Sequence, residues 1–171
     1  MYSFTKLMCS TCGPDVALER VVRGEHERLD ALFEESRRAL DDDDLGYAVR
    51  RFREFQQGLV EHARWEEQSL FGECTRCGVS GVSQPLDGHR REHQAIETAL
   101  ADMAERLEAA WRDGVARVPE LHDVFDALER MLGDHFDAEV GDLAQPLDRT
   151  LDAESREMLR TRLRQVHPEK R

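Results

Sequence analysis

The stretch from 86 to 110 reads LDGHRREHQAIETALADMAERLEAA and is typical of one helix of a helical bundle. Its apolar residues recur at alternating steps of three and four, which places them on one face of a helix. Two histidines four residues apart, His89 and His93, fall in the same stripe, so both are expected to face the bundle interior. The stripe consists of Leu86, His89, His93, Ile96, Leu100, Met103, Leu107 and Ala110.

Three other segments carry the same kind of stripe, and each has its own inward histidine. Proline, glycine and aspartate mark the ends of these segments; Pro14 is expected near the first start, and Pro146 is expected to end the fourth helix. Short links between the helices predict an all-α, up-down-up-down four-helix bundle with an additional short C-terminal helix. The four helices are expected at roughly 15–40, 46–71, 85–113 and 120–145.

The chain of 171 residues is interpreted as one domain: an N-terminal cysteine-containing tail (1–13), the bundle (14–146) and the C-terminal helix (151–167). No stretch approaches the ~20 apolar residues that are needed to cross a membrane. The formal net charge of −12 argues against binding to nucleic acid or to anionic membranes. The start of the chain carries no apolar signal segment, so a cytoplasmic location is expected. The sequence leaves the oligomeric state open.

Five histidines and two glutamates on the inward stripes form a candidate metal site. A buried carboxylate needs a cationic partner, and the stripes supply imidazoles rather than lysine or arginine. A lone inward histidine such as His26 would by itself be interpreted as a core residue. The whole set exceeds the four ligands of a single zinc site and suits two transition ions with mixed nitrogen and oxygen ligands. The candidate ligands are His26, His62, Glu66, His89, His93, His135 and Glu139.

The order and spacing of these residues resemble the hemerythrin-like, or HHE cation-binding, family. The resemblance covers the four bundle helices and implies a non-haem site of two iron ions. It departs from the oxygen-carrying hemerythrins at one point: Val140 stands where their last carboxylate falls, and the acid comes one residue earlier, at Glu139. The resemblance implies His89, His93 and His135 on one iron, His26 and His62 on the other, and Glu66 and Glu139 as bridges.

The ligand set implied by this resemblance leaves one coordination position open. Two near six-coordinate irons need about twelve bonds, and the protein ligands with an oxo or hydroxo bridge supply about eleven. We expect the open position beside His26 and His62, where O2, NO or peroxide could bind. Apolar walls would slow proton delivery, which favours reversible binding or sensing over turnover. The expected walls are Val22, Leu29, Leu59, Ala63, Ile96, Leu132 and Phe136.

Two Cys-x-x-Cys-Gly motifs are a second candidate metal site. In an up-down bundle, the start of the first helix and the end of the second lie at the same end, so the two motifs should meet. Four thiols would make a tetrahedral zinc or iron site, while two independent dithiols or disulfides remain the alternative. The candidate ligands are Cys9, Cys12, Cys74 and Cys77.

Three classes of function remain open from the sequence. The favoured class is a di-iron protein that binds O2 or a related small ligand, for oxygen binding or sensing. The second is a di-iron redox enzyme, either a peroxidase or an NO-reducing enzyme. Such an enzyme would receive electrons from a donor through the four-cysteine site. The third is iron storage or donation. We favour a protein that binds metal and O2 over an enzyme, and we assign no catalytic residue.

Overall fold

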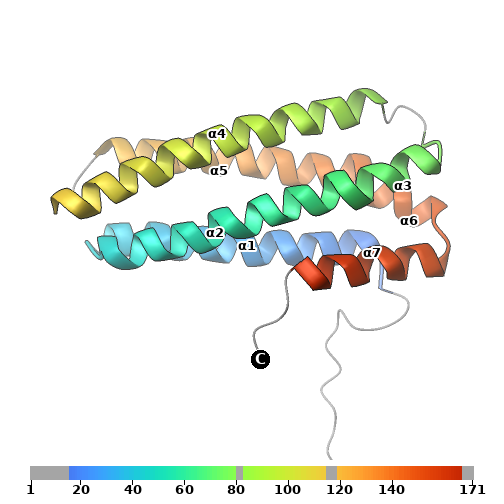
Figure 1. Ribbon diagram of the computed structural model, residues 1–171, viewed down its shortest axis with the longest axis horizontal. Coiled ribbons are helices and arrows are strands. Elements are labelled where there is room, and N and C mark those ends of the chain that lie inside the picture. Colours follow the sequence, from blue (N-terminus) through green and yellow to red (C-terminus); the bar gives the residue numbers. More distant parts are fainter. Residues whose placement is uncertain (1–15, 80–82, 115–118, 167–171) are drawn as a thin grey trace, which may run out of the picture.

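The computed structural model describes residues 16–79, 83–114 and 119–166. These residues form an up-down-up-down four-helix bundle, with a further helix along the outside of α1 and α2 (Figure 1). The predicted all-α bundle is therefore confirmed. The bundle helices are α1 (Leu18–Asp41), α2 (Leu45–Trp65), α4 (Ser83–Asp113) and α5 (Pro119–Glu139), and the outer helix is α7 (Ala153–Val166).

Two of the bundle helices extend further than the sequence predicted. After α2 the chain stays helical through a π-helical segment, η1 (Glu66–Leu70), into α3 (Phe71–Arg76). After α5 it continues through a second π-helical segment, η2 (Val140–Ala144), into α6 (Gln145–Thr150). The prediction that Pro146 ends the fourth helix was therefore wrong. Pro146 occupies the first turn of α6, directly after the π-helical segment, where a missing amide donor costs little.

The turn between α1 and α2 depends on two aspartates. Asp43 adopts a left-handed conformation with φ of 59°, which aspartate tolerates better than most residues. The side chain of Asp44 then accepts a hydrogen bond from the Tyr47 amide at 3.0 Å and caps α2. Farther along, α1 and α2 approach closely at Gly58, where a Cβ atom would lie 2.9 Å from Leu29 Cδ2. The tight turn and the close approach hold these two helices in fixed register.

The buried apolar residues form two clusters, one on each side of the inward histidines. The larger cluster includes Leu29, Leu59 and Ile96 and extends toward the α1–α2 turn. The smaller cluster includes Leu18, Val22 and residues of α3, α6 and α7 at the opposite end. His26 follows Val22 of one cluster and precedes Leu29 of the other, so the candidate site lies between two apolar layers.

The outer helix α7 packs its leucines Leu159 and Leu163 against the smaller cluster. Arg160 of the same helix is only 1 % exposed, although arginine is rarely buried. Its guanidinium donates to the backbone carbonyl of Val16 and to the Glu157 carboxylate, because burial requires these partners. None of the helices in the described ranges is long and apolar enough to cross a membrane.

Candidate metal centre

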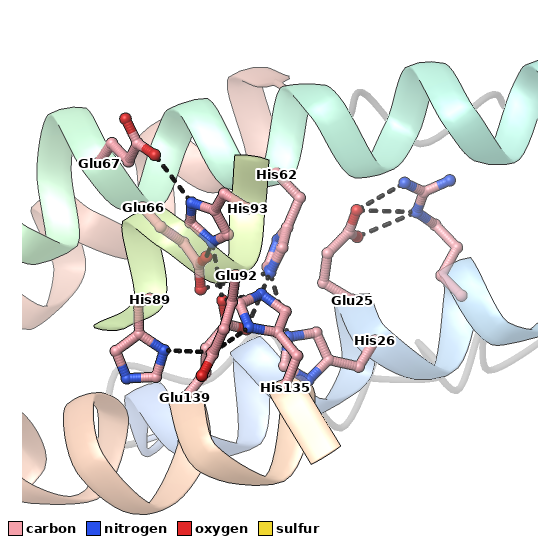
Figure 2. Close-up of polar contacts among 11 residues, drawn as sticks. Glu25, His26, His62, Glu66, Glu67, His89, Glu92, His93, His135 and Glu139 are labelled. Carbon is pink, nitrogen blue, oxygen red and sulfur yellow. Dashed lines mark hydrogen bonds and ion pairs between the residues drawn. The ribbon is translucent and has the colours of Figure 1, made fainter. Parts of the chain in front are cut away.

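Each bundle helix contributes one histidine to the centre, and α2 and α5 lead into the glutamates (Figure 2). Glu66 begins η1, and Glu139 is the last residue of α5. Six residues make up two overlapping groups, and all of them are buried. The first group is His26, His62, Glu66 and Glu139, and the second group is Glu66, His93, His135 and Glu139.

In the first group, two imidazoles from α1 and α2 face each other across the bundle. His26 Nε2 lies 3.1 Å from His62 Nε2 and 3.1 Å from Glu139 Oε2. His62 Nε2 also lies 3.4 Å from Glu66 Oε1. The Nε2 atoms and one oxygen of each carboxylate therefore converge on one small volume.

In the second group, imidazoles from α4 and α5 face the other oxygens of the same carboxylates. His135 Nε2 lies 2.8 Å from Glu139 Oε1, and His93 Nε2 lies 3.3 Å from it. His93 Nε2 is also 3.3 Å from Glu66 Oε2. Each glutamate thus turns one oxygen toward each group, which is the arrangement that a carboxylate needs to bridge two cations.

Three of the four carboxylate oxygens at the centre lack ordinary hydrogen bonds to described residues. Both oxygens of Glu66 and Oε2 of Glu139 accept no hydrogen bond from a residue that the structure describes, although imidazole nitrogens lie nearby. Buried carboxylates in this state are costly unless a cation neutralises them. Nitrogen and carboxylate donors in this mixture suit first-row transition ions. The donor set therefore fits metal ions.

The pKa values of the histidines and of Glu139 also indicate a centre that attracts positive charge. Burial opposes protonation of the imidazoles, but the charges of Glu66 and Glu139 outweigh it and raise the pKa of His62 to about 10. The same balance raises the pKa of His93 to about 11. Burial opposes ionisation of Glu139, yet its contacts to Glu66, His135 and other members of the site hold its pKa well below the usual value. The centre therefore holds positive charge, from protons or from metal ions.

Two glutamates outside the centre orient the imidazoles of the second group. Glu67 accepts a hydrogen bond from His93 Nδ1–H at 2.8 Å, and Glu92 accepts one from His135 Nδ1–H at 2.9 Å. With Nδ1 carrying the proton, the Nε2 lone pair is free to face a metal ion. Neither role was predicted from the sequence. The available signal was position alone: Glu67 directly follows Glu66, and Glu92 directly precedes His93.

His89 is the one expected ligand outside the two groups. It is buried, and its Nδ1 lies 3.4 Å from Glu92 Oε2 while its Nε2 lies 4.0 Å from Asp142 Oδ2. With Glu92 and His135 it forms a third group of possible ligands that adjoins the second group (Figure 2). His89 is therefore a neighbour of the centre.

The π-helical segments coincide with the two shared glutamates. One begins at Glu66, and the other directly follows Glu139. A π-helical turn adds about one residue to the helix, and such turns are frequent at functional sites. After η1, the ring of Phe71 stacks on His93 with 6.0 Å between centroids, and on the other side Phe136 stacks on His26 at 3.9 Å. An apolar ring thus backs one imidazole of each group.

A small cavity of about 10 Å³ lies between α2 and α4 and reaches both groups. Three of the expected wall residues, Leu59, Ala63 and Ile96, line it. The other four are buried elsewhere, Val22 in the smaller apolar cluster and Leu29, Leu132 and Phe136 in the larger one. The cavity also touches imidazoles of both groups, whereas the sequence placed the pocket beside His26 and His62. Its remaining lining residues are Val60, His62, His93, Glu97, Leu100 and His135.

The second cysteine motif begins inside helix α3, although the sequence predicted that the second helix ends near residue 71. Cys74 is buried in α3, Cys77 directly follows that helix, and neither forms a disulfide with a residue that the structure describes. Gly78 adopts a left-handed φ of 59°, and Val79 N–H donates to the Cys74 carbonyl, so the glycine serves as a helix cap. Burial is the main cause that raises the pKa of Cys74 to about 12. Cys9 and Cys12 lie outside the described residues.

A bundle with paired histidine and glutamate groups in its core defines a metal-binding protein. Residues 18–147 match the family described as the hemerythrin HHE cation binding domain, and the chain belongs to this family. All seven expected histidine and glutamate ligands fall within the matched residues, whereas Cys9 and Cys12 precede them. Comparison with curated proteins and with solved structures found no match.

Proposed function

We propose that the chain binds two iron ions and takes up O2 or a related small ligand, for oxygen binding or sensing. The observation that carries the proposal is the sharing of Glu66 and Glu139 between two groups of imidazoles, with one oxygen of each directed to each group. We include His89 as the fifth imidazole ligand, because it is buried next to the second group and shares a third group of possible ligands with His135 and Glu92.

The cavity favours a ligand of very few atoms. Its volume of about 10 Å³ admits about one water-sized molecule. Leu59, Ala63 and Ile96 give it an apolar wall, while His62 and His93 connect it to both groups. Two iron ions would supply the redox couple and an open coordination position there. The chain itself would exclude larger molecules and limit the access of bulk water, which supports binding over turnover.

The test combines metal analysis with optical spectra. Protein expressed with ample iron should contain two irons per chain, and Glu66→Ala and Glu139→Ala should each lose most of this iron. Glu105→Ala is the matched control, because Glu105 is exposed on α4 outside the centre. Anaerobically reduced protein should change its spectrum in air and recover when O2 is removed. One metal or none per wild-type chain would refute the di-iron proposal.

The same spectra separate the other classes of function. Consumption of O2 or peroxide without recovery of the reduced spectrum would indicate the redox enzyme. Rapid transfer of iron to a mild chelator would indicate storage or donation. Either result would replace the binding or sensing role while leaving the metal site in place.

We also propose that Cys9, Cys12, Cys74 and Cys77 share one zinc or iron ion. The observation in favour is that Leu18, at the start of α1, belongs to the same apolar cluster as Cys74, with Cys77 packed against it. Cys12 precedes Leu18 by six residues, which can span at most about 20 Å. A metal ion would displace the proton that burial keeps on Cys74.

A third metal per chain would be the signature of the cysteine site. We expect Cys9→Ser and Cys77→Ser each to remove this metal and to leave the two irons in place. Loss of the third metal in Cys77→Ser but not in Cys9→Ser would contradict a shared site, and a wild-type chain with no third metal would contradict any metal at the cysteines.

A further inference from the structure

A polar cleft, separate from the cavity at the metal centre, lies between α7 and the junction of α2 with η1. Its volume is about 460 Å³, within the range of small-molecule sites. It is much larger than a single inorganic ion requires. Its lining includes Arg64, Trp65, Gln68, Ser69, Arg162 and Gln165.

The cleft carries one arginine on each wall, Arg64 from α2 and Arg162 from α7. Neither forms an ion pair with a residue that the structure describes, although the chain carries a net charge of −12. Elsewhere arginines such as Arg37 and Arg51 pair with two carboxylates each. Two guanidinium groups therefore remain available across the cleft, and their planar forks match carboxylate and phosphate groups.

The rest of the lining is aromatic and polar. Trp65, which is only 3 % exposed, forms part of the inner wall of the cleft. Ser69 lies beside it on η1 and is also buried, and Gln68 and Gln165 add amide groups at the sides. Among the described residues that line the cleft, Glu61 is the single carboxylate, and it stands against two arginines, so this lining favours an anion.

We propose that this cleft binds a small organic anion that bears carboxylate or phosphate groups, held between Arg64 and Arg162. Trp65 separates the cleft from the metal centre, since its ring centroid lies 5.9 Å from that of His62. An occupant would thus lie one side chain away from a proposed iron ligand. The cleft itself is made of residues outside the metal site, so this proposal holds whether or not two irons bind.

Isothermal titration calorimetry on the full metal-containing chain tests the proposal. Succinate and ribose 5-phosphate are the probes for the two anion chemistries, and inorganic sulfate is the reference ion. We expect a dissociation constant of about 1 mM or tighter for at least one organic probe. Arg64→Gln and Arg162→Gln should each weaken it at least about tenfold, because each removes a charge-assisted contact. Whichever probe binds identifies carboxylate or phosphate as the recognised group.

Arg130→Gln is the matched control, since Arg130 is an exposed arginine of α5 and not part of the cleft. It changes the net charge equally and should leave the affinity unchanged. Three results would overturn the proposal: no saturable binding of either probe up to about 20 mM, equal weakening by Arg130→Gln, or sulfate binding as tight as that of the organic probes, which would mean an adventitious ion only. Thermal melts of all three variants establish that they are folded.

Discussion

At the scale of single residues, the orientation of the inward imidazoles depends on acids that look like ordinary surface residues. Glu67 and Glu92 hold Nδ1 of His93 and His135, and both are partly exposed, at 41 % and 48 %. Without such a partner, an imidazole can turn or exchange its tautomer, so the Nε2 lone pair is no longer fixed toward the centre. The geometry of the buried site is therefore partly controlled from the surface.

This dependence predicts the effect of removing either acid. Glu67→Ala and Glu92→Ala should each lower the affinity for iron about 10- to 100-fold while the fold is retained. Competition with a coloured chelator measures this affinity, and Glu105→Ala serves as the control for loss of an exposed acid on α4. Unchanged affinity in both variants would mean that these hydrogen bonds do not orient the imidazoles.

The raised histidine pKa values predict how the stability of the metal-free protein depends on pH. His62, with a pKa of about 10, and His93, with a pKa of about 11, hold their protons more tightly in the folded chain than in the unfolded chain, where the value is 6.5. Their contribution to stability is complete below pH 6.5 and disappears as the pH rises through about 10 to 11. The lowered pKa of Glu139 acts at the acid side, where its contribution is lost as the pH falls below about 4.5.

The urea midpoint of the metal-free protein should therefore be lower at pH 9 than at pH 6.5. A Glu66→Gln/Glu139→Gln variant should show a smaller decline over the same interval, since it lacks the charges that raise the histidine pKa values. An equal or higher wild-type midpoint at pH 9 would contradict the raised pKa values of His62 and His93 in the folded chain.

Residues of the site could be predicted from the sequence as far as helical periodicity extends. His26, His62, His93 and His135 are buried where their stripes place them, because an amphipathic helix fixes which side faces the core. The roles of Glu67 and Glu92 could not be predicted in this way. Each contacts a histidine of a neighbouring helix, and that contact depends on helix rotation and spacing that one segment does not encode.

At the scale of helices, the departure from the prediction comes from the two π-helical segments. A stripe at α-helical spacing does not reveal a five-residue π-helical segment with a different period. The end of the fourth helix was predicted from Pro146, which the helix accommodates in the first turn of α6. After η1, Phe71 reaches the face of His93. The extra residue of each π-helical turn therefore adjusts the register between the glutamate and the apolar residues that follow it.

A pair of deletions tests this account of η1. Deleting Gln68 should convert the π-helical turn into a regular α-helical turn and cost less than about 2 kcal/mol, or a fall in Tm below about 8 °C. Deleting the exposed Gln57 in the regular part of α2 should be far more damaging, because it rotates one part of the helix against the other by about 100°. Circular dichroism melts compare the two. Equal damage by both deletions would show that η1 does not absorb a residue.

At the scale of the whole molecule, Arg160 connects α7 to the segment that leads into α1, because its guanidinium donates a hydrogen bond to the Val16 carbonyl. Arg160→Ala should destabilise the fold by about 1.5–3 kcal/mol, because it removes the charged donor to the Val16 carbonyl. Arg164→Ala is the control: its 3.6 Å pair with Glu157 is exposed and should contribute less than about 1 kcal/mol. Urea unfolding measures both. Similar values for the two variants would mean that the buried guanidinium is not what holds α7.

Metal binding should act on all four bundle helices at once. The two groups draw one imidazole from each of α1, α2, α4 and α5, and the apolar clusters on either side can hold the helices together without metal. We therefore expect a folded metal-free protein that melts earlier than the metal-loaded one. With free iron at about 100 times its dissociation constant, binding adds about 2.7 kcal/mol, or roughly 5–11 °C in Tm.

The metal-dependent rise in Tm should vanish in Glu66→Ala/Glu139→Ala, which lacks both shared carboxylates, and persist in Glu105→Ala, in which an exposed residue outside the centre is changed. Differential scanning calorimetry with and without iron provides the comparison. Equal melting temperatures for the metal-free and metal-loaded wild-type chain would show that iron does not bind where the four helices meet. A rise that survives loss of both glutamates would place the bound metal elsewhere in the chain.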